Sequence, residues 1–255
     1  MMKREKTITR TTRLLLVYLA IAVMLCGSSL YLAYATPQGA TVSGSPSVDA
    51  GPNKTPTNRS DLGGRIITIN LDLEQQNFAW KAYVGNVTGK YVLESASNFS
   101  IYEWPTGTSI DGEVYISRNS SVNFGSGQIT CATIPEMVTE NTFFGFDGAS
   151  PDNINGTFNA SAHQAFQAGT GNNFAANDCN ATALWVNDTL QTPGSSAVFQ
   201  EVALHDGSNM VYAAIINNNE FGFDNTTQFD FQAIIPENRT ASAGTNYYFY
   251  VEIGS

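Results

Sequence analysis

The sequence has few of the residues on which metal sites and nucleic-acid interfaces depend. Only 13% of its 255 residues are charged, and it contains 2 histidines and 3 cysteines. The net charge of −10 gives no electrostatic support for binding nucleic acid. The histidines, His163 and His205, form no cluster with the cysteines at the spacing of a zinc site. We therefore expect no nucleic-acid partner and no zinc.

Catalytic motifs are equally scarce. The chain has neither a Gly-x-Ser-x-Gly nucleophile motif nor a phosphate-binding glycine loop. A thiol of Cys131 or Cys179 could pair with His163 for nucleophilic chemistry, although a disulfide is the favoured state of these cysteines. Paired carboxylates can hydrolyse glycosides, and the acids considered for that role are Glu103, Asp111, Glu113 and Glu201. Surface solvation is the ordinary explanation for such acids, so we predict that the protein is not an enzyme.

The N-terminus combines a basic segment with an apolar run. Residues 1–13 hold five basic residues against one acidic residue, and residues 14–35 carry no charge. A helix of about 20 apolar residues spans a bilayer core, and basic residues before such a helix keep its N-terminal side in the cytoplasm. We predict a cytoplasmic tail (1–13), a membrane segment (14–35) that contains Cys26, and an extracellular remainder.

A cleaved signal peptide is the alternative for the same run. Residues 14–26 have the length of a signal-peptide core, and Ala33-Tyr34-Ala35 fits a cleavage site. In the first case the protein is a single-pass membrane protein, and in the second it is secreted after cleavage behind Ala35. Both cases place residues 36–255 outside the cell.

A linker is predicted next. Residues 36–64 contain four prolines, five glycines and eight serines or threonines, a composition that cannot bury enough apolar surface to fold. As a loose coil this segment would separate its ends by roughly 30 Å. We expect it to act as a stalk for the domain that follows.

From residue 65 onward the sequence indicates antiparallel strands. Apolar residues alternate with polar ones in residues 67–73, 198–204, 229–235 and 247–253, a period typical of half-buried strands. We predict an all-β domain at 65–255, an antiparallel two-layer β-sandwich. Residues 135–190 break the pattern, and we expect an irregular excursion with short helices there, one of them around His163.

The two cysteines outside the apolar run, Cys131 and Cys179, are predicted to form a disulfide, because an even pair in an exported domain is usually oxidised. Two free thiols are the alternative. The disulfide would close a loop of about 50 residues and stabilise the domain by roughly 4 kcal/mol.

Asparagine-linked glycosylation is the most strongly indicated modification. Of 24 asparagines, eleven begin an Asn-x-Ser/Thr sequon, whereas chance predicts about four. Turn preference explains the asparagines but not the hydroxyl residues two positions later. One sequon lies in Gly85–Gly89, which we interpret as a hairpin tip. The predicted sites are Asn53, Asn58, Asn86, Asn98, Asn119, Asn155, Asn159, Asn180, Asn187, Asn225 and Asn238.

Two weaker binding hypotheses remain. Calcium is the only cofactor considered, for an oxygen-rich loop whose ligands would be Asp147, Asp152, Asn153 and Asn155, although the spacing does not match an EF-hand. Exposed aromatic residues could bind carbohydrate, with core packing as the ordinary alternative. The aromatic candidates are Trp80, Tyr83, Trp104, Tyr115, Trp185, Tyr248 and Tyr250, of which Tyr248 and Tyr250 are expected to point outward.

Four segments together resemble a family of uncharacterised archaeal cell-surface glycoproteins. They are WKAYVGNVTG (80–89), GEVYIS (112–117), FDFQAIIPEN (229–238) and YYFYVEI (247–253). In that family the blocks W-x-x-[YF]-x-GNVTG, DFQ-x-x-x-P and YYF-x-VE recur. The resemblance implies an archaeal origin and a surface location, and it implies no catalytic activity.

The expected function follows from these features. We expect a membrane-anchored, glycosylated extracellular protein with a structural or adhesive role at the cell envelope. Its expected partners are the membrane, through residues 14–35, N-linked glycans, and envelope proteins or carbohydrate. One alternative is a carbohydrate- or ligand-binding module. Another is a filament subunit that donates the strand Arg65–Glu74 to a neighbouring subunit.

Overall fold

The computed structural model describes residues 36–43, 58–71, 77–107, 110–238 and 244–254. The predicted cytoplasmic tail, the membrane segment 14–35 and Asn53 lie outside these ranges. The described chain is mostly antiparallel β-structure, which confirms the all-β class. The helices are α2 (Ile134–Phe144) and α3 (Ile154–Thr157). The strands are β1 (Gln38–Gly39), β2 (Trp80–Gly85), β3 (Lys90–Glu94), β4 (Ser100–Pro105), β5 (Gly112–Ser117), β6 (Thr130–Cys131), β7 (Phe166–Gln167), β8 (Asn173–Phe174), β9 (Ala181–Ala183), β10 (Gln200–His205), β11 (Met210–Ile215), β12 (Glu220–Phe221), β13 (Gln228–Phe229), β14 (Phe231–Pro236) and β15 (Tyr248–Ile253).

A seven-stranded sheet organises the domain. Its order is β1-β15-β5-β11-β10-β6, and β9 pairs with β10 beside β6. A tight hairpin joins β10 to β11, and in its turn Asp206 accepts hydrogen bonds from the backbone N–H groups of Ser208 and Asn209. Four further two-stranded sheets are formed by β2 with β14, β3 with β4, β7 with β8, and β12 with β13.

Both faces of the central strands are buried. Every residue of β10 and β11 is buried, and alternate residues of each strand belong to two separate apolar clusters. The alternation in residues 198–204 predicted half-buried strands, and this prediction is wrong for β10. It fails because the polar-looking positions, among them Glu201 and His205, are covered by other parts of the chain.

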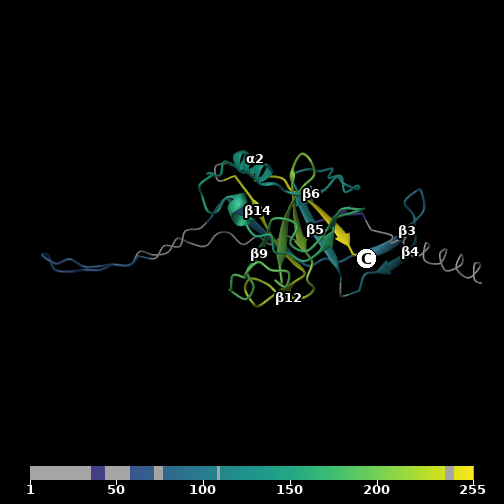
Figure 1. Cartoon of the computed structure of the whole chain (residues 1–255). Coiled ribbons are helices and arrows are strands. Elements are labelled where there is room, and N and C mark those ends of the chain that lie inside the picture. Colours follow the sequence, from purple (N-terminus) through teal and green to yellow (C-terminus); the bar gives the residue numbers. More distant parts are fainter. Residues whose placement is uncertain (1–35, 44–57, 72–76, 108–109, 239–243, 255) are drawn as a thin grey trace, which may run out of the picture. The chain divides into compact units, whose positions relative to one another are not determined.

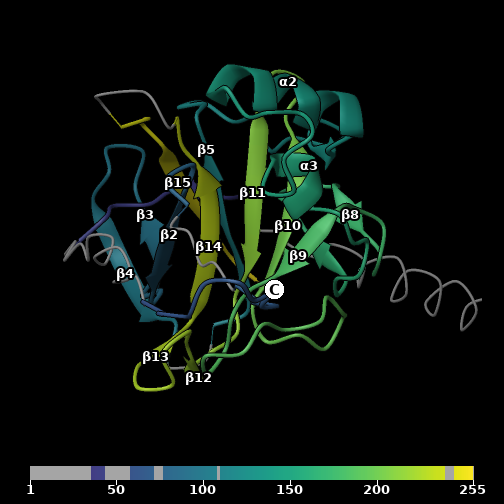
Figure 2. The same cartoon turned by 90° about the vertical axis from the view of Figure 1, so that its left-hand side faces the viewer.

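The pair β2–β14 and the two helices cover one face of the sheet. Ala233 and Ile235 of β14 share a cluster with Met137 and Phe144 of α2 and with Tyr212 of β11. Figure 2 shows β14 in front of the large sheet, with α2 and α3 beside β11.

A buried carboxyl group joins β14 to the large sheet. Glu201 of β10 is fully buried, and its Oε2 accepts a hydrogen bond of 2.9 Å from the backbone N–H of Ile234. The Glu201 side chain therefore accepts from a backbone N–H of β14 that a neighbouring strand would otherwise pair with. Burial raises the pKa of Glu201 well above its ordinary value, while the hydrogen bond from the Ile234 N–H lowers it.

Irregular segments cover the opposite face. Phe124, Phe166 and Phe174 pack with Val211 and Ala213 of β11 in the second cluster. The segment around His163 forms no helix and has no regular secondary structure until β7 begins, which corrects the expectation of a helix there. The imidazole accepts a hydrogen bond at Nε2 from the Cys179 N–H (2.9 Å) and donates from Nδ1 to the Gln164 carbonyl (2.6 Å).

Two predicted elements near the start of the domain are wrong. Gly85–Gly89 is not a hairpin tip, because β2 pairs with β14 whereas β3 pairs with β4. The segment instead links the β2–β14 sheet to the β3–β4 sheet. A hydrogen bond from the Val87 N–H to the Asp230 side chain (2.8 Å) holds it in place. The described part of the predicted strand Arg65–Glu74 (65–71) is neither paired nor buried; Ile66 and Leu71 are exposed.

The start of the predicted stalk is part of the fold. Gln38 and Gly39 pair with Val251 and Tyr250 of β15, and Pro37 is buried. The expectation that all of 36–64 is a free linker is therefore wrong for its first residues. The composition of this segment did not predict the β1–β15 pairing, because that pairing uses backbone hydrogen bonds rather than large apolar side chains.

Candidate functional surface

The sequons lie mostly on exposed connections. Six of the described sequon asparagines are exposed, and none of the six lies within a strand or helix: Asn58, Asn86, Asn98, Asn159, Asn187 and Asn225. Asn98, Asn187 and Asn225 have positive φ angles of 60°, 50° and 49°, a conformation that asparagine tolerates in tight turns. Each of the six is accessible to a modifying enzyme.

The four other described sequon asparagines are only partly exposed. Asn119 Nδ2, the atom that would carry the sugar, donates to Asp206 Oδ2 (2.6 Å). Asn180 Nδ2 donates to the Ala132 carbonyl (3.3 Å). The side-chain oxygen of Asn155 accepts a hydrogen bond from Asn141, and Asn238 is half-buried. These asparagines already contribute to the fold, so we rank them below the exposed six as acceptors.

The predicted disulfide between Cys131 and Cys179 is confirmed, with the two Cα atoms 5.0 Å apart. It joins β6, at the edge of the large sheet, to the segment just before β9. Cys179 is buried, and its N–H donates to His163 Nε2. The cysteines and His163 thus lie close together as structural groups, and the catalytic cysteine–histidine pair considered from the sequence is excluded by the disulfide.

The oxygen-rich loop at 147–155 is held by protein donors. Asn153 is buried and caps α3 by accepting a hydrogen bond from the Gly156 N–H (2.6 Å), while its amide donates to the Gly148 carbonyl. Asp152 accepts hydrogen bonds from Ser150 and Asn77. In the described ranges no group of three or more His, Cys, Asp or Glu side chains is arranged to hold a metal ion. Calcium binding stays a prediction.

A carboxyl pair lies under the irregular cover. Glu113 of β5 and Glu252 of β15 face each other across the ladder, and the Tyr115 hydroxyl lies 3.4 Å and 3.1 Å from their oxygens. Burial, together with the charge of Glu252, raises the pKa of Glu113 to about 8, and burial also raises the pKa of Glu252. The Gln167 carbonyl and the Gly169 N–H complete this cluster.

The other acids considered for catalysis are apart from that pair. Glu103 forms an exposed ion pair with Lys90 (2.6 Å) on the β3–β4 ribbon. Glu201 lies on the opposite face of the sheet from Glu113, and Asp111 precedes β5 on the surface. Of the four acids considered, only Glu113 therefore belongs to this buried pair, whose members Glu113 and Glu252 are 8% and 5% exposed.

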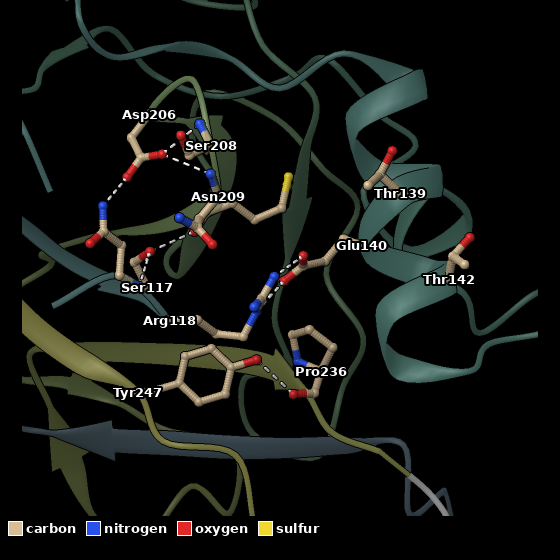
Figure 3. A network of polar contacts seen from close by, with 12 residues as sticks. Ser117, Arg118, Thr139, Glu140, Thr142, Asp206, Ser208, Asn209, Pro236 and Tyr247 are labelled. Atoms are coloured by element: carbon tan, nitrogen blue, oxygen red, sulfur yellow. Dashed lines mark hydrogen bonds and ion pairs between the residues drawn. The ribbon is translucent and has the colours of Figure 1, made fainter.

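Figure 3 shows a polar network between α2 and the end of β5. Arg118 donates to both oxygens of Glu140, over 3.0 Å and 2.5 Å, and its guanidinium stacks on Phe143 at 3.8 Å from the ring centroid. Burial alone would lower the pKa of Arg118, but the hydrogen bonds and charge of Glu140 raise it. Below this pair the Tyr247 hydroxyl donates to the Pro236 carbonyl (2.8 Å). The network fixes α2 to the sheet.

The most unusual surface is the β3–β4 ribbon. Neither strand pairs with any other described strand, and every residue of β4 is exposed. Tyr91 faces Trp104 and Leu93 faces Tyr102 across the ladder, and directly opposed residues share a face. All four side chains are 47–58% exposed, and Phe99 at the tip is 73% exposed. Soluble proteins seldom leave apolar side chains contiguous and uncovered in this way without a binding role.

Most other aromatic candidates serve the core. Trp80 contacts Phe146 and Phe158, and Tyr83 packs edge-on to Phe249. Tyr115 is fully buried. Tyr250 was expected to point outward and is instead 9% exposed, because its hydroxyl donates to the Asn119 carbonyl. Tyr248 and Trp185 are exposed, as Trp104 is.

Among the ribbon residues, only Trp104 and Glu103 were candidates from the sequence. Phe99, Ile101 and Tyr102 were missed, because apolar and polar residues alternate poorly in this segment. The available signal was eight consecutive uncharged residues, 95–102, that include Phe99, Ile101 and Tyr102.

Among the residues that the structure describes, no helix is both long enough and apolar enough to cross a bilayer. Comparison with protein-family models, curated proteins and solved structures gave no match to this chain.

Proposed function

We propose that this chain is an extracellular glycoprotein, anchored in the cell membrane by residues 14–35, with a structural or adhesive role at the envelope and no catalytic role. The displayed domain is an antiparallel sandwich in which β2–β14 provides the second layer. The resemblance in its four segments adds that the envelope is archaeal. Secretion after cleavage behind Ala35 is the variant of this proposal in which the anchor is lost.

The observation that carries the proposal is the placement of the sequons. Six exposed asparagines of the described residues lie on connections between strands and helices. Asn177 and Asn219 also have positive φ angles, yet neither begins a sequon. Turn geometry alone therefore does not require the hydroxyl residues that follow Asn187 and Asn225, whereas sugar attachment does.

The disulfide and the low charge content agree with this location. Disulfides persist in oxidising compartments outside the cytoplasm, and Cys131–Cys179 fastens an irregular cover that contains few strands. A coat of glycans would supply solubility to a chain in which only 13% of the residues are charged.

Protease treatment of intact native cells tests the topology, and mass spectrometry of intact glycopeptides tests the modification. We expect the domain to be removed from the cell surface, with sugars on Asn58, Asn86, Asn159, Asn187 or Asn225 and an oxidised Cys131–Cys179 pair. Peptides that begin at Thr36 would identify the secreted variant. A domain that resists the protease until the cells are lysed, and that carries no sugar, would contradict the proposal.

Strand donation between subunits is a second candidate function. Residues 65–71 are unpaired, and Ile66, Ile69 and Leu71 are exposed. A neighbouring copy could pair this segment with one of its open sheet edges, because an unpaired edge is a template for an added strand. Replacing Ile66 and Leu71 by serine should then dissolve native filaments. Assemblies that persist unchanged in this variant would exclude it.

A further inference from the structure

The β3–β4 ribbon is fixed at one end of the domain and otherwise uncovered. At its base, Gly89 approaches the side chain of Ile253, and the Tyr91 hydroxyl lies 3.5 Å from the Gly254 carbonyl. Figure 1 shows the ribbon beside the C-terminal end of β15. A two-stranded ribbon is barely stable alone in water, so these apolar side chains need a partner outside the described fold.

The chain enters the domain at the same end of β15. Gln38 pairs with Val251 in antiparallel register, and continuing that register by two residues brings Thr36 to the level of Ile253. Pro37 is buried against Gly169, so the first described residues are held against the domain rather than free to swing. The uncharged run 14–35 ends one residue before Thr36. In the sequence, the proposed membrane segment therefore directly precedes the residue that the β1–β15 register brings to the end of β15.

We propose that the β3–β4 ribbon inserts its aromatic face into the lipid interface and gives the domain a second contact with the bilayer. This inference rests on the proposed membrane anchor. Tryptophan and tyrosine are the residues that favour the boundary between headgroups and acyl chains, and Trp104, Tyr102 and Tyr91 lie on one face. Residues 95–102 at and near the tip carry no charge, so their entry costs no desolvation of an ion.

The same face is less suited to carbohydrate. The rings of Tyr102 and Trp104 are tilted by 48° to one another rather than forming a flat platform. The ion pair of Lys90 with Glu103 lies on the other face, because Glu103 alternates with Tyr102 and Trp104 along β4. The hydroxyl groups of a sugar would therefore lack charged partners beside the rings.

Tryptophan fluorescence of the full chain in proteoliposomes tests the proposal. The probe is a vesicle of dioleoylphosphatidylcholine that contains dibrominated phosphatidylcholine, whose bromine atoms quench tryptophan on contact. Residues 14–35 contain no tryptophan, so all emission comes from Trp80, Trp104 and Trp185. We expect part of the wild-type emission to be quenched, and we expect Trp104→Phe to abolish this quenching. Trp185→Phe is the matched control, because Trp185 is 51% and Trp104 is 48% exposed.

The outcomes separate the ribbon from the anchor. A chain that floats with the vesicles but shows no quenching, or keeps it in Trp104→Phe, would overturn the ribbon proposal alone. A chain that fails to float would overturn the anchor and the ribbon together. Pairing of ribbons between two copies would shield Trp104 from both brominated lipid and aqueous acrylamide, which also contradicts lipid contact. High occupancy of a glycan on Asn98, at the ribbon tip of native protein, would oppose insertion as well.

Discussion

Glu113 and Glu252 lie opposite each other on neighbouring strands, and the hydroxyl of Tyr115 is within 3.4 Å of an oxygen of each. The hydroxyl carries a single proton, so it cannot donate to both carboxylates and to the Gln167 carbonyl, 2.9 Å away, at the same time. Two buried carboxylates this close cannot both remain ionised without a large cost. The cluster therefore retains a proton near neutral pH, and Glu113, whose pKa is raised to about 8, is the favoured site for it.

The first prediction is that lowering the pH from 8 to 5 stabilises the domain. In the folded state the pKa of Glu113 is raised from 4.5 to about 8, so the folded state binds a proton more tightly than the unfolded chain. The stabilisation is complete below the unfolded pKa and is lost as the pH rises toward 8. For Glu113 alone the full shift corresponds to roughly 5 kcal/mol. Denaturant unfolding at several pH values measures the slope.

Two variants control this experiment. Glu113→Gln mimics the protonated acid, so it should unfold at higher denaturant concentration than the wild type at pH 8 and show a flatter pH profile. Glu94→Gln removes an exposed carboxylate on the ribbon and should leave the profile unchanged. A wild type whose stability rises between pH 5 and pH 8 would show that the pair is ionised and compensated by other groups.

A second prediction concerns the contact between Arg118 and Glu140. Their side chains are only 19% and 6% exposed, so Arg118→Met leaves the charge of Glu140 buried without a partner. We expect a loss of about 3 kcal/mol in unfolding free energy, and recovery of most of it in Arg118→Met/Glu140→Leu. Lys90→Met breaks an ion pair whose members are 54% and 45% exposed, and it should cost less than about 1 kcal/mol. Equal losses of unfolding free energy in Arg118→Met and Lys90→Met would contradict this difference between a buried and an exposed ion pair.

Local patterns in the sequence predicted several strands, one turn, the disulfide and the exposure of some sequons. The strands around residues 200–204, 231–235 and 248–253 follow from alternation, and the β10–β11 turn follows from Asp206-Gly207. The disulfide followed from the cysteine count and the expected compartment. Asn86, Asn225 and Asn238 were expected in loops from the polar, Gly- or Asn-rich composition around them; Asn86 and Asn225 are exposed, whereas Asn238 is half-buried.

These local patterns did not predict which strands pair when they are distant in the sequence. Gly85–Gly89 has the composition of a hairpin turn, yet β2 pairs with a strand about 150 residues later, because Ala233 and Ile235 of that strand bury apolar area against the large sheet. Residues 65–71 alternate like a strand but have no described neighbour to pair with. The carboxyl pair and the aromatic ribbon were missed for the same reason, since each arises from residues brought together across a ladder.

A third prediction concerns the disulfide. Cys131 and Cys179 are separated by 48 residues, and closing a loop of that size stabilises a fold by roughly 4 kcal/mol. Cys131→Ser/Cys179→Ser should therefore unfold at a clearly lower denaturant concentration. Reduction of the wild type with dithiothreitol should reproduce the loss, while the double variant should not respond to the reductant. A double variant as stable as the oxidised wild type would show that the cover over β10 and β11 needs no covalent fastening.

The last prediction compares two glycines, Gly112 and Gly127, that both have a positive φ but differ in the space around them. Gly112 begins β5 with φ of 141°, and a Cβ there would lie 2.0 Å from the backbone oxygen of Glu252, which cannot move without breaking the β5–β15 ladder. Gly127 has φ of 72° and open space around the same position. Gly127→Ala should cost about 1 kcal/mol, the strain of a left-handed residue alone. Gly112→Ala adds a backbone clash and should cost more than about 3 kcal/mol, measured by thermal and denaturant unfolding. The carboxyl pair lies beside Gly112, so Gly112→Ala should also lower the pH at which the Glu113–Glu252 pair loses its proton. If neither the titration nor the stability of Gly112→Ala changes, β5 and β15 separate at the Gly112 end of their ladder.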